Sequence, residues 1–385
     1  MISIIRFEMA KIVKTKRFIG SLLISVLVLS GIFIIGFHYS QLGASEVRNQ
    51  ELGFNQLSRK KANAHAGVFN DQTVRLILAD YIADYQNNSG GEQPFDQFSY
   101  NIANTFFPKD RDIYLEMIAA NKKKQTLKID QIKLTPIKKI GFSSFSKPLI
   151  IGSYSNWSEL FKVTGSVFIL ISVLVIITGS TVFAEDTAKK MNQLLFITKY
   201  GRTKMLRAKI YTATVLSLFI FLVAHGLTFG YFYYHYYGMD GWNGSIQTNF
   251  DLKLFNFPLE LNHFQIYLMI LILQLASLLM IVGITLLISA IAKTPFSAVI
   301  IATGIFFLPK GLILIFTSGV LNKLLYLLPI NLYDSEKMLT LMSAKQGFFF
   351  NQFNQNFIMT ICILLLTNLI SNCFTYYKLQ HAYIE

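Results

Sequence analysis

The side chains best suited to chemistry gather in one segment, residues 185–209. Glu185 and Asp186 begin it, and seven Lys or Arg side chains follow as far as Lys209, with Arg202 placed after a glycine turn. An apolar cluster lies between the charges, formed by Leu194, Leu195 and Phe196. A basic, partly apolar helix offers a ridge and a charged rim to a second protein. We therefore interpret the segment as a docking element.

Signatures of enzymes are absent from the sequence. It contains no phosphate-binding P-loop motif, no HExxH motif, and no His, Cys and carboxylate set at the spacing of metal ligands. Its two cysteines, Cys362 and Cys373, both fall in the last apolar run, so neither a disulfide in the polar part nor a zinc site is predicted. We expect no catalytic residue, no metal and no cofactor in this chain.

Three polar side chains stand within apolar runs and are candidates for a polar pathway. His225 is either a packed, hydrogen-bonded neutral histidine or a proton or substrate contact. Gln274 is either an interhelical hydrogen-bonding group or a substrate contact. Lys310 follows Pro309, and it either snorkels to an interface or lines a path.

The composition is typical of a membrane protein. Of the 385 residues, 53% are hydrophobic and only 15% are charged, whereas a soluble domain carries about 25% charged residues. The formal net charge is +14, but the cations are divided among loops and do not gather on one soluble face. We therefore exclude nucleic acid as a partner and expect membrane lipid.

The order of polar and apolar segments predicts a mostly α-helical, polytopic fold. Residues 1–17 form a basic amphipathic helix that lies at the membrane surface, and residues 18–37 form the first span. Residues 38–160 form one mixed α/β, helix-rich domain, with helix over 45–86 and loose strand-like alternation over 127–140.

Residues 161–385 carry five further spans, which brings the predicted total to six. These spans cover residues 161–183, 210–237, 264–291, 296–316 and 357–376. The loops 238–262 and 317–356 lie between spans on the outer side, and short helices flank Pro329 in the second of them. The fifth span is either kinked and short or broken at Pro309.

Charge asymmetry predicts the orientation. Five cations against Glu8 precede the first span, and segment 185–209 is the most basic loop, so both termini and this loop are predicted to be cytoplasmic. The 38–160 domain is then extracytoplasmic. It carries fifteen basic against eleven acidic residues between positions 46 and 147, a surface that favours anionic headgroups or wall polymers over cationic peptides.

Segment 185–209 resembles the signature of type-2 ABC transporter permeases. The residues that carry the resemblance are Glu185, Asp186, Leu194-Leu195-Phe196-Ile197-Thr198, Gly201-Arg202 and Lys209. The sequence departs from the family pattern where Lys190-Met191 replaces Gly-Thr, Lys199 replaces Pro and Ala208 replaces Gly. The large domain after the first span resembles the branch of sodium and antibiotic export permeases.

This resemblance implies a bacterial permease subunit of an ABC exporter. It implies separate ATPase subunits that bind ATP and Mg²⁺ and dock on segment 185–209, and a second permease copy or homologue that helps to enclose the path. The extracytoplasmic domain would then gate exit, bind substrate or contribute to antimicrobial peptide resistance. The alternative is a non-transporting membrane receptor or secretion scaffold with a functional external domain. An ion-coupled carrier is disfavoured, because the spans contain neither internal repeats nor carboxylates.

Overall fold

The computed structural model describes residues 1–42, 54–87, 96–198, 200–236, 238–343 and 348–381. The fold is mostly helical (76%), and six of its helical segments are long and apolar enough to cross a membrane. Both findings confirm the predicted mostly α, six-span class. The chain divides into two compact units. The first unit comprises residues 1–32, 163–228 and 270–385, and the second comprises residues 33–162 and 229–269.

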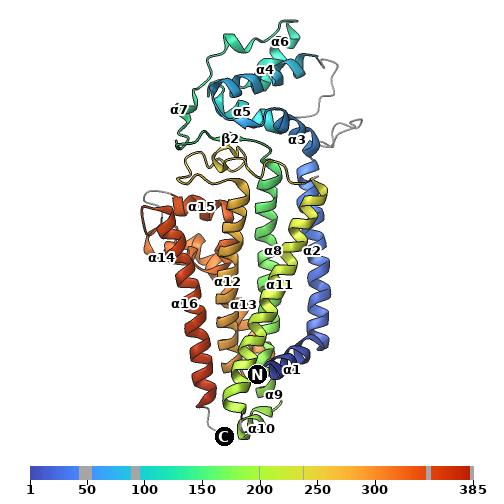
Figure 1. The fold of residues 1–385 in the computed structure, drawn as a ribbon, viewed down its shortest axis with the longest axis vertical. Helices are drawn as coiled ribbons and strands as arrows, with labels where there is room; N and C mark the ends of the chain where they lie inside the picture. Colours follow the sequence, from blue (N-terminus) through green and yellow to red (C-terminus); the bar gives the residue numbers. More distant parts are fainter. Residues whose placement is uncertain (43–53, 88–95, 199, 237, 344–347, 382–385) are drawn as a thin grey trace. The chain divides into compact units, whose positions relative to one another are not determined.

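The six long segments appear in Figure 1 as extended coiled ribbons. They are α2 (Lys16–Leu42), α8 (Ser155–Gly179) continued by α9 (Thr181–Ala188), α11 (Leu206–His235) preceded by the π-turn η2 (Gly201–Met205), α12 (His263–Ile291), α13 (Pro295–Ile315) and α16 (Phe353–Gln380). A separate short helix, α1 (Ile2–Val13), precedes them. Runs of about 20 apolar residues favour the helix in a bilayer because the helix satisfies its backbone polar groups internally.

The fifth span is one continuous helix. Pro295 occupies its first turn, Thr294 and Ser297 form a capping box, and the helix continues past Pro309 to Ile315. The predicted alternative of a break at Pro309 is therefore wrong. A proline removes only one backbone hydrogen bond, and the remaining bonds of this apolar helix have no better partner in a membrane.

Short elements complete the first unit between α13 and α16. They are α14 (Gly319–Tyr326), the 3₁₀ turn η4 (Pro329–Tyr333) and α15 (Ser335–Ser343), close to the two short helices predicted on either side of Pro329. The η4 turn packs tightly against α8, since a Cβ atom on Gly165 would lie 2.2 Å from the carbonyl oxygen of Tyr333. Glycine is required at that position by the close approach of the backbones.

The second unit contains five short helices around an apolar core. They are α3 (Phe54–Ala64), α4 (Asp71–Asn87), α5 (Gln97–Phe106), α6 (Ile113–Lys122) and α7 (Ile137–Ile140). Strand β1 (Gly67–Val68) pairs antiparallel with β2 (Ile150–Ile151). The strand predicted over 127–140 is wrong: a 3₁₀ turn (Ile129–Gln131) and α7 occupy it. Its alternate apolar residues pack against the core, but Pro136 and the absence of a neighbouring strand among the described residues prevent a ladder.

The loop 238–262 belongs to this second core. Phe250 is buried in it, and Phe255 stacks on Phe142 with ring centroids 4.7 Å apart. Asp251 accepts a hydrogen bond of 2.7 Å from Asn101. The prediction of a domain confined to 38–160 missed this contribution, since nothing in the local sequence marks a contact about 150 positions away.

Candidate docking surface

Segment 185–209 begins with α9, whose first turn is fixed by a residue of α12. The Ser289 hydroxyl accepts hydrogen bonds of 3.1 Å from the backbone N–H groups of Phe183 and Ala184, and it donates to the Ser180 carbonyl at 2.9 Å. The orphan N–H groups at a helix start need such acceptors. Ser289 is fully buried, so the orientation of α9 is set by the bundle and not by solvent.

A sharp turn at Lys190 directs the chain into α10 (Met191–Ile197). Lys190 has φ +54°, a left-handed conformation that glycine adopts without penalty and other residues adopt at a cost of about 1–2 kcal/mol. The resembled family places glycine at this position. A glycine would adopt this turn without strain, whereas the lysine of this chain adopts it at that cost.

The helix α10 exposes an apolar ridge. Leu194 is 70% exposed and Ile197 is 72% exposed, with Met191 beside them at 38%. Leu195 and Phe196, which were predicted together with Leu194 to contact a partner, are only partly exposed. We call Met191, Leu194 and Ile197 the α10 ridge. Large apolar side chains in such a group mark an interaction surface.

Leu195 and Phe196 instead hold the segment together. The Leu195 carbonyl accepts hydrogen bonds from the Thr198 backbone N–H at 3.2 Å and hydroxyl at 2.7 Å. A Cβ atom on Gly201 would lie 1.7 Å from this carbonyl oxygen, so glycine is required there. The Arg202 guanidinium lies 5.4 Å from the centre of the Phe196 ring, an attractive cation–π contact.

Asp186 and Lys209 lie in a buried ion cluster with the N-terminal helix. The Lys209 ammonium is 2.6 Å from Asp186 and 3.3 Å from Glu8, and it donates to the Val182 carbonyl at 3.0 Å. Lys11 donates to the other carboxylate oxygen of Asp186 at 2.8 Å. The cluster joins α1, α9 and α11, and its two cations balance its two anions. Glu185 is not part of it, because it pairs with Lys189 at 2.6 Å.

The contribution of α1 to this cluster was missed by the sequence analysis. Glu8 is 2% exposed although it lies on a helix predicted only to rest on the membrane surface. Burial alone would lower the pKa of Lys11, but the hydrogen bond and attraction of Asp186 outweigh it and raise that pKa above 10.5. The sequence feature that could have indicated this contact is Glu8 itself, the single acid in the otherwise basic segment 1–17.

The family to which the chain belongs follows from comparison with known proteins. The sequence model of the ABC-2 family transporter proteins matches residues 2–385. This chain belongs to that family. It is therefore a multi-pass membrane protein and the permease type of subunit, which transports and does not itself catalyse. Comparison with curated proteins and with solved structures found no significant match.

The three candidate pathway residues of this ABC-2 permease lie apart from the ion cluster. Lys310 is exposed on α13, where its ammonium donates to the Tyr333 hydroxyl at 2.9 Å and lies 4.4 Å from that ring. His225 is buried on α11 against Phe221, with ring centroids 4.3 Å apart. Gln274 is buried on α12. Neither His225 nor Gln274 makes a hydrogen bond with the described residues, so the interhelical bonds considered for them do not form within this part of the chain.

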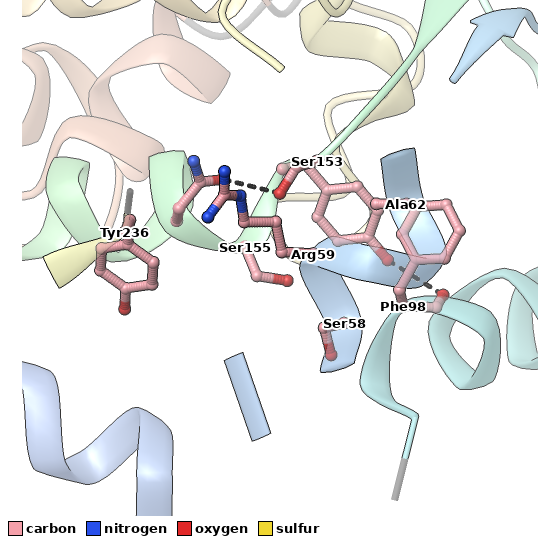
Figure 2. Close-up of a pocket in the computed structure, with 9 residues that line it drawn as sticks. Ser58, Arg59, Ala62, Phe98, Ser153, Ser155 and Tyr236 are labelled. Atoms are coloured by element: carbon pink, nitrogen blue, oxygen red, sulfur yellow. Dashed lines mark hydrogen bonds between the residues drawn. The ribbon is translucent and has the colours of Figure 1, made fainter. Parts of the chain in front are cut away.

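A small hollow in the second unit of the permease is too confined to hold a transported molecule. Figure 2 shows its lining, which includes Ser58, Arg59 and Tyr236. Its volume is about 10 Å³, the space of about one water molecule. Ser153 donates to the Asn156 side chain at 3.1 Å, while the Ser58 hydroxyl is buried and has no partner among the described residues. The hollow suits a structural water at Ser58.

Proposed function

We propose that this ABC-2 permease is the membrane subunit of an ATP-driven exporter and that a separate ATPase docks on segment 185–209. The single observation that carries the proposal is the exposed α10 ridge on a rigid support. Ser289 fixes the start of α9, the ion cluster fixes both ends of the segment, and the ridge projects between them. Movement of a docked partner would therefore reach the spanning helices and would not be absorbed by a loose loop.

The charge of the segment also supports a cytoplasmic ATPase. Arg202, Lys204 and Arg207 lie beyond the ridge, and cations of short loops face the cytoplasm. In this proposal both termini are cytoplasmic and the α3–α7 region is extracytoplasmic. The ATPase subunits hold ATP and Mg²⁺, and this chain holds no cofactor.

The proposed exporter contains a second permease copy or homologue. Two of the spans are little buried within this chain: only 6% of the most apolar stretch of α2 is buried, and only 17% of that of α16. By contrast, 72% of the corresponding stretch of α8–α9 is buried. Lipid and a second permease would share the uncovered apolar surface. The family supports a transport subunit, whereas a receptor or scaffold would need neither the ridge nor the rigid support.

The test is site-specific photocrosslinking in native membranes. A photoreactive amino acid at Ile197 should form an adduct with a polypeptide that also labels with 8-azido-ATP and retains ADP–vanadate. The double variant Leu194→Asp/Ile197→Asp, with the photoreactive group moved to Met191, should lose this adduct because each carboxylate would be desolvated at the interface.

The control is Thr203→Asp, which adds one carboxylate, against two in the double variant, at an exposed position of η2 outside the ridge. It should leave the adduct unchanged. Phe196 is an unsuitable position for this test, because loss of its contact with Arg202 would disturb the segment itself, and Leu195 is only partly exposed. An adduct with no nucleotide-binding polypeptide, or one that survives the double variant, would reject the proposed docking.

A further inference from the structure

The middle of α12 contains two neighbouring polar side chains without hydrogen-bond partners among the described residues. Gln274 is 1% exposed, and neither its amide oxygen nor its amide nitrogen has a hydrogen-bond partner among the described residues. The hydroxyl of Ser277, one turn further, is equally buried and unpaired within that part of the chain. By contrast, Ser172, Ser217 and Thr228 each donate to a carbonyl of their own helix.

These unpaired groups are costly in a membrane. An amide or hydroxyl in an apolar environment loses several kcal/mol unless something hydrogen-bonds to it. The helix itself is uncharged, because α12 contains no Asp, Glu, Lys or Arg. Gln274 also lies far along α12 from Ser289, the residue of α12 that bonds to the start of α9: the two are 15 positions apart, or about 22 Å at 1.5 Å per residue. A partner for Gln274 is therefore expected to carry both donors and acceptors and no net charge.

An apolar cavity of about 60 Å³ follows on the same face of α12. The helix contributes Met280, Ile281, Ile284 and Thr285 to its lining. An α-helix has 3.6 residues per turn. Viewed down the axis of α12, Ser277 therefore lies about 10° and Gln274 about 50° from the centre of the face formed by these lining residues. The unpaired polar atoms and the cavity thus follow one another along one face of α12, which we call the strip, with its polar part at Gln274 and its apolar part beginning one turn beyond Ser277.

The cavity is narrow and reaches the lipid-facing side of α13. Its volume is less than half of the roughly 150 Å³ that accommodates benzene in an engineered cavity. Ile305 lines it and is 47% exposed, so one wall borders the bilayer. These features fit the end of a slender alkyl chain that enters sideways from lipid.

We propose that this strip binds an uncharged amphiphile, with its hydrogen-bonding head at Gln274 and Ser277 and its alkyl chain in the cavity. The inference deepens the proposed function, because it gives the molecule handled by the permease a chemical class. An amide head on an unbranched chain matches the donors and acceptors of the glutamine side chain. A carboxylate or an ammonium would meet no opposite charge on α12.

The test uses the whole permease alone in phosphatidylcholine nanodiscs, with decanamide as the probe. Decanamide should raise the melting temperature, because a ligand that binds only the folded state stabilises it. Decane, decanoate and decylammonium at equal mole fraction should give no comparable rise. Gln274→Leu should weaken the apparent affinity for decanamide about tenfold, the loss of one or two hydrogen bonds. Ala302→Leu should also abolish the rise in melting temperature, because the larger side chain fills the cavity that holds the alkyl chain.

A matched control separates binding from folding. Gln247 is also fully buried, but its amide donates to the carbonyls of Phe257 at 3.0 Å and Leu259 at 2.7 Å. Gln247→Leu should lower the melting temperature and retain the decanamide response, whereas Gln274→Leu should not lower it. An equal response to decane, or a full decanamide response in Gln274→Leu, would overturn the inference. The measurement needs no ATPase, so failed docking at the α10 ridge would leave its result unchanged.

Discussion

Replacement of Lys209 by methionine tests whether the ion cluster stabilises the support of the docking surface. The substitution keeps the length of the side chain but leaves Glu8 and Asp186 with Lys11 as the remaining cation, so one buried negative charge becomes unbalanced. Loss of one partner from a buried ion pair costs about 3–5 kcal/mol. Lys209 is only 2% exposed and has three partners, so we expect a loss near 4 kcal/mol in the free energy of unfolding.

The assay is reversible unfolding by dodecyl sulfate in mixed micelles. The variant Glu8→Gln restores the charge balance when combined with Lys209→Met, so the double variant should lose about 1–3 kcal/mol less than the sum of the two single changes. Lys189→Met is the control, because its ion pair with Glu185 is 58% exposed on the lysine side and contributes at most about 0.5 kcal/mol. A Lys209→Met loss as small as that of the control would refute the buried cluster.

Three further predictions concern single positions. Lys190→Gly should raise the free energy of unfolding by up to about 1 kcal/mol in the same assay, whereas Lys190→Ala should not, because only glycine relieves the left-handed turn. Burial raises the pKa of the Asp96 carboxyl above 3.8, so its protonated form favours folding. The melting temperature should fall as pH rises from 3.8 through the raised pKa, and Asp96→Asn, which can still cap α5, should reduce that slope. A cysteine at Ser89 should react with an impermeant thiol reagent on intact cells and one at Thr203 should not; the reverse pattern would invert the proposed orientation.

The number of spans could be predicted because it depends on local composition. About 20 apolar residues in sequence leave the helix as the favoured structure in lipid, whatever the rest of the chain does. The start of α8 was predicted at Phe161 but lies at Ser155. Its polar first turn is satisfied by distant groups: Trp157 donates to the Asp240 carbonyl at 3.0 Å and Ser158 to Asn249 at 2.9 Å. A helix end stabilised in this way has no signal in its own residues.

The site was predictable in its location and less so in its detail. Charge and apolar pattern identified segment 185–209, but the exposure of Ile197 and the partial burial of Phe196 depend on the turn at Lys190 and on the position of Arg202. Glu8 and Ser289 act on this segment from more than a hundred positions away. Contacts of that range follow from the packing of helices and not from any pattern within one of them.

The two buried polar sets of the first unit differ in how completely their groups are paired, and this difference suggests different roles. In the ion cluster two cations balance two anions, and the Lys209 ammonium also bonds a carbonyl, so rearrangement would separate charges in a low dielectric. Gln274 has no such partner among the described residues, so bonding to an arriving molecule would cost no existing bond. The paired set is therefore suited to transmit force without deforming, and the unpaired set is suited to bind and release. A permease needs both properties, and here one bundle of helices carries both.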